Sequence, residues 1–255
     1  MIPHHLISGL QDGPPVVLSH SLATNLSMWD AILAPLEQQF RVIRYDARGH
    51  GASSATGNDY SLQDLVADVT DLLDHLAIER AHFVGLSMGG MVGMGLGIDH
   101  ADRLLRLVVC DARADAPPTY RNAWDTRIAA VMAGGMAAIA GATVDRWFTD
   151  GFKSDALAVA RMRMMVEATP LEGYVGCARA LKDLDYKRRL GAISVPVLYL
   201  VGDQDLGAPP EEMRAMQRLT PGARFLKIAG AGHISVVEQP VEAGTAISDF
   251  LSDKH

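Results

Sequence analysis

Residues 85–89 read Gly85-Leu86-Ser87-Met88-Gly89, which is the pattern G-x-S-x-G. The apolar run His82-Phe83-Val84 comes directly before it, and a helical pattern over residues 88–100 begins within it. A strand, a tight turn and a helix in this order hold a serine in a strained backbone region, with its hydroxyl at the edge of a sheet. The flanking glycines leave room for such a turn. We therefore interpret Ser87 as a nucleophile, and no lysine follows that would indicate a phosphate-binding loop.

Short apolar runs alternate with helical patterns over most of the chain. The runs are apolar on both faces, which is typical of strands in a buried parallel sheet. The clearest helix covers residues 62–76, where apolar residues recur at helical spacing, and Ser61 and Asp64 predict its capping box. The alternation predicts right-handed β-α-β units and an open α/β sheet with helices on both faces. The predicted strands cover residues 16–18, 42–45, 82–84, 104–110, 197–201 and 223–228.

The alternation fails over residues 116–185. This segment begins with Pro117-Pro118, is rich in Met and Ala, and contains no convincing strand. It also holds two of the three tryptophans, Trp124 and Trp147. We predict a helical cap that is folded over the carboxyl edge of the sheet. The cap is inserted into a core made of residues 1–115 and 186–255.

Composition excludes several classes of protein. The chain has 255 residues, 49% of them hydrophobic, and a formal net charge of −7. These values exclude disorder and a collagen-like repeat, and the charge argues against a nucleic acid or an anionic membrane as partner. Two cysteines, Cys110 and Cys177, are too few for a disulfide framework and lack metal-ligand spacing. Because of this spacing, we expect the protein to bind no metal. The first residues resemble no signal peptide, so we expect a cytoplasmic protein.

A serine that attacks an acyl group needs a base, and histidine has a suitable pKa. Three histidines follow Ser87: His100, His233 and His255. His100 ends the helix that starts at the serine, about 20 Å away at a rise of about 1.5 Å per residue. His255 is the last residue of the sequence, whereas His233 lies in a glycine-rich loop after the last predicted strand. Elimination therefore assigns His233 as the base.

Three aspartates follow predicted strands and could orient His233: Asp111, Asp203 and Asp205. In the G-x-S-x-G fold the acid lies between serine and histidine in the chain, which all three satisfy. We favour Asp205, because the spacing Gly202-x-x-Asp205 places it beyond the turn that ends the strand. Asp203 is assigned to shape that turn. Asp111 stays the geometric alternative.

Two backbone N–H groups are needed to hold a developing oxyanion. One is expected from Met88, directly after the nucleophile, and the other from the loop over residues 19–23, where we choose Leu22. His20 in the same loop is assigned a shaping role, because Ser87 already has a base. The segment over residues 45–51 contains Asp and His but is interpreted as a structural turn beside this loop.

These motifs together resemble the α/β-hydrolase superfamily over essentially the whole chain. Within it, the sequence is most similar to 3-oxoadipate enol-lactonases. The resemblance implies an α/β-hydrolase fold with a mostly parallel sheet of the eight-stranded type and a helical cap. One departure is His20, where those lactonases usually carry asparagine. The superfamily motifs are Ser19-His20-Ser21-Leu22, Asp46-Ala47-Arg48-Gly49-His50-Gly51, the pattern at 85–89, Gly202-x-x-Asp205 and Gly232-His233. The lactonase motifs are Ser21-Leu22 with the following Met28-Trp29, Ala133-Gly134-Gly135-Met136-Ala137, Arg146-Trp147-Phe148-Thr149, His233-Ile234-Ser235 and Glu238-Gln239-Pro240.

The resemblance implies hydrolysis of a small carboxylated enol-lactone through an acyl-enzyme, as in the β-ketoadipate pathway of aromatic catabolism. Such a route needs no metal or organic cofactor, and its partner is a small ester or lactone. One alternative is a general carboxylesterase or perhydrolase-like enzyme that acts on neutral esters. A second is a ligand-binding receptor on the same fold, which could keep all three site residues.

A carboxylated lactone is an anion that approaches a protein of net charge −7, so it needs a local cation. Arg146, in the motif shared with the lactonases, is the candidate; alternatively it pairs at the surface with Asp145 or Asp150. Four further side chains are predicted either to line an apolar pocket or to form the core of the cap. These are Trp124, Met132, Met136 and Trp147.

Overall fold

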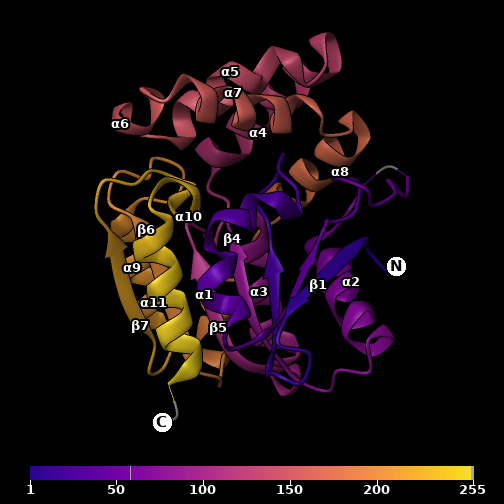
Figure 1. Cartoon of the computed structure of the whole chain (residues 1–255). Helices are drawn as coiled ribbons and strands as arrows, with labels where there is room; N and C mark the ends of the chain where they lie inside the picture. The colour runs from indigo at the N-terminus through magenta and orange to yellow at the C-terminus, as the bar shows by residue number, and fades with distance from the viewer. Residues whose placement is uncertain (58, 254–255) are drawn as a thin grey trace.

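The computed structural model describes residues 1–57 and 59–253. A seven-stranded sheet runs through its centre in the order β1-β3-β2-β4-β5-β6-β7 (Figure 1). All neighbouring strands are parallel except β1, which pairs antiparallel with β3. The strands are β1 His5–Gly9, β2 Pro15–Ser19, β3 Arg41–Tyr45, β4 Ala81–Leu86, β5 Leu104–Cys110, β6 Val197–Gly202 and β7 Arg224–Ile228.

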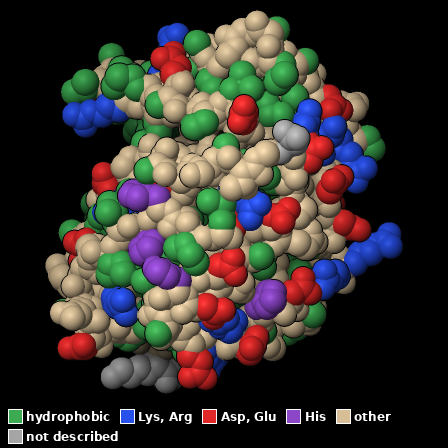
Figure 2. All heavy atoms as spheres, turned by 90° about the vertical axis from the view of Figure 1, so that its right-hand side faces the viewer, with side chains coloured by type: hydrophobic (Ala, Val, Ile, Leu, Met, Phe, Trp, Pro, Cys, Tyr) green, Lys and Arg blue, Asp and Glu red, His purple; other side chains and the backbone are tan. Residues whose placement is uncertain are grey.

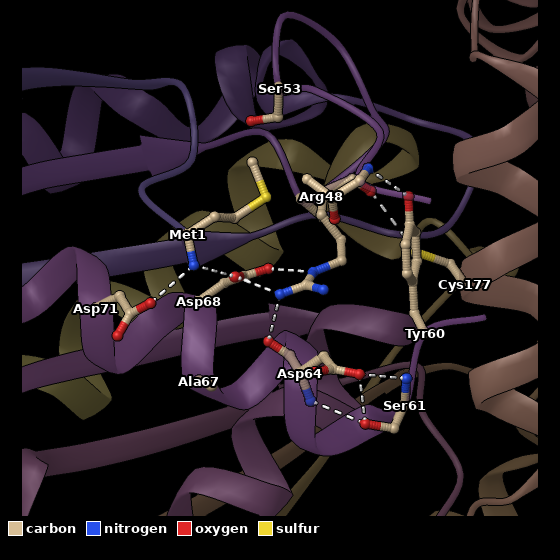
Figure 3. A network of polar contacts seen from close by, with 12 residues as sticks. Met1, Arg48, Ser53, Tyr60, Ser61, Asp64, Ala67, Asp68, Asp71 and Cys177 are labelled. Carbon is tan, nitrogen blue, oxygen red and sulfur yellow. Dashed lines mark hydrogen bonds and ion pairs between the residues drawn. The ribbon is translucent and has the colours of Figure 1, made fainter. Parts of the chain in front are cut away.

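All six predicted strands are present, and the prediction missed β1. Its pattern HLISG has no clean alternation, and its side chains are half-buried or exposed. The sheet has seven strands in the described residues, not the eight of the predicted type. Residues 1–4 form no strand there, and Pro3 among them has no N–H to donate. In addition, the Met1 ammonium group binds Asp68 and Asp71 on α2, which draws the chain towards that helix (Figure 3).

Helices cover both faces of the sheet. On one face α2 (Leu62–His75), α3 (Met88–Asp99) and α9 (Pro210–Leu219) pack in a row, joined by the 3-10 helix η3 (Lys187–Ala192). On the other, α1 (Leu33–Glu37) packs on α11 (Pro240–Ser252), together with α10 (Ser235–Glu238) and η1 (Leu26–Ile32) (Figure 1). A short 3-10 helix, η2 (Ala101–Arg103), leads into β5. The capping box of α2 is present as predicted: the Asp64 N–H donates to Ser61 Oγ, and the Ser61 N–H donates to the Asp64 carboxylate.

Five α-helices between β5 and β6 form a layer above the sheet, which we call the cap (Figure 1). At the base of this segment Asp115 pairs with Asp185 in an isolated antiparallel bridge. In Figure 2, hydrophobic side chains gather at the top of the molecule, over these helices. The division into a core and a cap at residues 116 and 185 stays a prediction, since α8 also packs on α2 of the core. The helices are α4 Pro118–Gly134, α5 Ala137–Trp147, α6 Asp150–Lys153, α7 Ala156–Glu167 and α8 Leu171–Lys182.

The topology brings the predicted site residues to one edge of the sheet. Parallel strands end at the same edge, and Ser19 at the end of β2 is paired with Gly85 near the end of β4. The chain crosses in opposite directions on the two sides of this pair, because β3 lies beyond β2 and β5 lies beyond β4. Ligands of open α/β sheets bind in the crevice at such a switch point.

Candidate active site

Ser87 occupies the tight turn that its flanking residues predict. It lies between β4 and α3 with φ 55° and ψ −111°, a backbone region that is unfavourable for residues other than glycine. A Cβ atom at Gly85 would lie 2.1 Å from the Gly89 carbonyl oxygen, so this turn requires glycine there. The Ser87 N–H donates to the Cys110 carbonyl at 2.9 Å, which ties the turn to β5. This hydrogen bond to β5 therefore helps to hold the strained turn in place. The Ser87 side chain faces a cavity.

His233 lies between Ser87 and Asp205. Its Nε2 atom is 3.0 Å from Ser87 Oγ, and its Nδ1 atom is 2.9 Å from each carboxylate oxygen of Asp205. Asp205 is only 2% exposed, and its Oδ1 atom also accepts hydrogen bonds from the Gly207 and Ala208 N–H groups. Since the carboxylate can only accept, Nδ1 carries the imidazole proton and the Nε2 lone pair faces the serine hydroxyl. The arrangement suits removal of the hydroxyl proton.

The two other aspartates hold loops. Asp111 accepts from the Gly202 N–H at 2.8 Å and from Ser235 Oγ at 2.5 Å, so it joins the ends of β5 and β6 to α10. Burial, followed by the nearby charge of Asp205, raises the pKa of the Asp111 carboxyl well above its usual value. Asp203 accepts from the Ala231 N–H at 3.3 Å and so shapes the turn. Within residues 1–57 and 59–253, Asp205 is the aspartate that contacts the His233 imidazole. His255 lies outside the described residues.

Hydrogen bonds to the Ser21 carbonyl hold the loop that contains Leu22. The Ser21 carbonyl accepts from His20 Nδ1 and Thr24 Oγ1, both at 2.7 Å, and from the Thr24 N–H at 3.2 Å. This carbonyl and the Leu22 N–H belong to one planar trans peptide group, so fixing the carbonyl sets the opposite direction of the N–H. No acceptor for the Leu22 N–H is found in the described part of the chain. Met88 is the first residue of α3, so its N–H has no acceptor inside the helix.

Two buried histidines connect this loop to the turn over residues 45–51. His20 Nε2 accepts from the Ala47 N–H at 2.9 Å, and His50 Nε2 accepts from the Ala23 N–H at 3.2 Å. Burial is the main cause that lowers both pKa values, and that of His50 falls to about 3. Both rings are therefore neutral at pH 7, each with its proton on Nδ1. His20 has the shaping role that the sequence predicted.

The turn itself is anchored to α2 and to the cap. Arg48 makes two hydrogen bonds of 2.6 Å to the buried Asp68 carboxylate, and its guanidinium lies over the Tyr60 ring (Figure 3). Cys177 on α8 lies with its Sγ atom 3.8 Å from the Arg48 carbonyl oxygen. The polar side chains of this turn are thus engaged within the fold, and the cap rests against it.

A cavity of about 330 Å³ lies between the sheet edge and the cap. Ser87 and His233 form its floor, and two arginines of the cap, Arg127 on α4 and Arg146 on α5, also line it. Neither guanidinium forms an ion pair with a carboxylate of the described residues. Burial and then the charge of Arg127 lower the pKa of Arg146 to about 10, so the group stays charged at pH 7. Two half-buried cations that face one cavity favour an anionic ligand.

The expected pocket residues are only partly in the pocket. Trp124 and Trp147 line it, whereas Met132 is 61% exposed and Met136 is buried within the cap, so the structure places neither methionine in the cavity. Helix α4 turns Met132 to solvent. Asp150 pairs with Lys153, and among the described residues Arg146 forms an ion pair with neither Asp145 nor Asp150. Sequence reasoning missed Arg127, although its spacing from Trp124 (i, i+3) places the two on one helix face; its guanidinium lies 4.6 Å from the Trp124 ring.

Comparison with known proteins identifies the family. The model of the alpha/beta hydrolase fold family matches residues 14–240. The chain belongs to the alpha/beta hydrolase fold family. The chain of this α/β hydrolase is 37% identical to 3-oxoadipate enol-lactonase 1 of Acinetobacter baylyi, over 96% of this chain and 91% of the relative. The prediction of a hydrolytic enzyme that resembles the enol-lactonases is thereby confirmed.

Two solved structures extend the comparison of this α/β hydrolase. The enol-lactonase from Burkholderia xenovorans LB400 is similar with a TM-score of 0.94 and 38% identity, over 98% of this chain and 96% of that one. A thermophilic esterase from Thermogutta terrifontis (malate bound) has a TM-score of 0.92 and 32% identity, over 97% and 92%. Among the described residues, no helix of this α/β hydrolase is long and apolar enough to cross a bilayer. The same residues contain no group of three His, Cys, Asp or Glu that could hold a metal ion.

Proposed function

We propose that this α/β hydrolase is a serine hydrolase that opens a small carboxylated enol-lactone, similar to 3-oxoadipate enol-lactone, through an acyl-enzyme. The observation that carries the proposal is the placement of two unpaired guanidiniums, Arg127 and Arg146, in the cavity that also holds Ser87 and His233. Relatives named as 3-oxoadipate enol-lactonases support the choice of lactone.

In the first half of the reaction Ser87 Oγ attacks the ring carbonyl while His233 Nε2 takes its proton. Asp205 accepts from Nδ1, which keeps the imidazole oriented and stabilises the imidazolium. The Leu22 and Met88 N–H groups hold the oxyanion, a contribution of about 10² to 10³ in rate for each donor. The ring C–O bond then breaks, and the enol oxygen takes the proton from His233. The enol becomes a ketone, so it leaves readily.

The second half removes the acyl group from the serine. Water attacks the ester carbon while His233 takes one of its protons, and the bond to Ser87 Oγ breaks as that proton passes to the serine. The product is an open-chain keto acid with a new carboxylate. The same two N–H groups hold the second oxyanion.

The arginines hold the carboxylate that the lactone already carries. A guanidinium and a carboxylate about 4 Å apart attract by up to about 4 kcal/mol near a protein surface, before desolvation costs. The Trp124 side chain also lines this part of the cavity wall. Fixing this end of the substrate aims the ring carbonyl at Ser87.

The test compares two ligands that differ only in charge: the carboxylated enol-lactone and its neutral carboxamide analogue. Arg146→Met keeps an unbranched apolar stem and removes the guanidinium with its charge. We expect the ratio of kcat/KM for the two ligands to fall about tenfold or more, which corresponds to about 1.4 kcal/mol of lost discrimination. An equal effect on both ligands would remove the carboxylate-binding role.

A general carboxylesterase is the second candidate. The aromatic side chains of Tyr120, Trp124 and Trp147 in the cavity, and the 32% identical esterase, favour it. This candidate predicts that the wild-type enzyme turns over a neutral aryl ester faster than the carboxylated lactone.

A further inference from the structure

One carboxylate joins the cap to the loop that carries His233. The Glu238 Oε2 atom accepts from the Gly232 N–H at 2.8 Å. Its Oε1 atom accepts from both the N–H, at 3.1 Å, and the side-chain hydroxyl of Thr149, which follows α5 in the cap. Glu238 thus receives three hydrogen bonds, two from the cap and one from the residue directly before His233.

The two segments that Glu238 joins also contact each other directly. The His233 N–H donates to the Trp147 carbonyl at 2.7 Å. A Cβ atom at Gly232 would lie 2.4 Å from the same carbonyl oxygen, so the backbones approach as closely as glycine allows. Residues 147–149 and 232–233 therefore form one hydrogen-bonded unit.

This unit carries both ends of the proposed substrate site. Arg146 and Trp147 line the cavity from the cap, and His233 lines it from the core. Asp205 already orients the imidazole through two contacts of 2.9 Å, without help from Glu238. Glu238 adds three hydrogen bonds to the junction between the segment that follows Arg146 and the segment that carries the imidazole.

We propose that Glu238 is a positioning residue that sets the spacing between the carboxylate-binding arginine of the cap and the base, and so makes the enzyme selective for carboxylated lactones. The inference rests on the proposed function, because it takes Arg146 as the carboxylate site. A substrate without a carboxylate does not use this spacing. Loss of Glu238 therefore affects the charged ligand more than the neutral one.

Glu238→Gln tests this role at constant side-chain size. A glutamine has one acceptor oxygen, so its NH₂ group must face donors on one side of the junction, and that side separates. Displacement of a bound group by about 1 Å can cost about 100-fold in rate. We expect the ratio of kcat/KM for the carboxylated lactone and its neutral carboxamide to fall about 10- to 100-fold, with most of the loss in kcat for the charged ligand.

Glu242→Gln is the matched control, because it removes the same charge four residues later, in the first turn of α11, from an exposed side chain. Its ratio is expected to equal that of the wild type. Thr149→Val is the second variant: it removes the hydroxyl that donates to Glu238 and that also accepts from the Phe152 N–H at 3.4 Å, and it should lower the ratio in the same direction by a smaller factor. If Glu238→Gln does not fold, the kcat/KM ratio of Thr149→Val tests the positioning role in its place.

Parallel losses for both ligands, or no loss for either, would overturn the proposal, since a merely structural residue gives one of these results. The Arg146→Met ratio separates this failure from that of the proposed function. If Arg146→Met changes the ratio and the Glu238 and Thr149 variants do not, only the positioning role is wrong. If Arg146→Met leaves the ratio unchanged, the carboxylate site itself is wrong.

Discussion

Thr24→Val tests whether the loop behind Leu22 sets the rate. Thr24 is 1% exposed, and its hydroxyl donates to the Ser21 carbonyl at 2.7 Å. Valine has nearly the same shape but no hydroxyl, so the change leaves the packing in place and removes one of three donors from this carbonyl. The peptide group is then less firmly held, and the direction of the Leu22 N–H becomes less well defined.

The magnitude follows from the number of contacts that remain. One hydrogen bond contributes about 1 kcal/mol net, which is about fivefold in rate. Complete loss of an oxyanion donor costs about 10² to 10³ and sets the upper limit. Because His20 Nδ1 and the Thr24 N–H still hold the carbonyl, we expect kcat to fall about 5- to 10-fold.

Steady-state kinetics on the carboxylated lactone and its neutral carboxamide measure the effect. Both ligands should lose kcat equally, with little change in KM, because the interaction is made mainly in the transition state. Thr24→Ser keeps the donor and should stay close to wild type. A normal kcat for Thr24→Val, or an increase in KM alone, would refute the reasoning.

Three further predictions follow from the site. Ser87→Ala should abolish turnover of both ligands while the protein keeps its thermal stability; retained turnover would exclude Ser87 as the nucleophile. Asp205→Asn should lower kcat about 10⁴-fold, as loss of the orienting acid does in other serine hydrolases, whereas Asp111→Asn should lower it far less; the reverse order would make Asp111 the acid. The pKa of buried His50 is about 3 in the fold and about 6.5 when unfolded, so the unfolded chain binds more protons between these values and stability falls as the pH falls. From pH 6.5 to pH 5 this group alone should remove about 1.6 kcal/mol of unfolding free energy, measured by urea denaturation, and His50→Gln should flatten the profile.

The chain order of local motifs identified most of the proposed triad. The strand–glycine–serine–helix pattern marks Ser87 because its geometry is encoded by neighbours in the sequence. His233 was reached by elimination among few histidines. The same reasoning left three aspartates open, because each follows a strand and sequence alone gives no distance between loops. Only the folded chain places the Asp205 carboxylate 2.9 Å from His233 Nδ1. The same fold engages the Asp111 carboxylate in hydrogen bonds with the Gly202 N–H and the Ser235 hydroxyl.

The binding side of the site depends on tertiary structure to a greater degree. Helical spacing could have paired Trp124 with Arg127, but nothing local says which face of α4 meets the cavity. Met132 therefore looked equivalent to Trp124 until the packing turned it to solvent. The sequence by itself determined the six strands β2 to β7, helix α2 and the strained serine turn, because backbone propensity and apolar periodicity act between near neighbours. The facing arginines and the junction of Glu238 with Thr149 and Gly232 were decided only by tertiary structure, because they join residues far apart in the chain and depend on how the cap packs on the sheet.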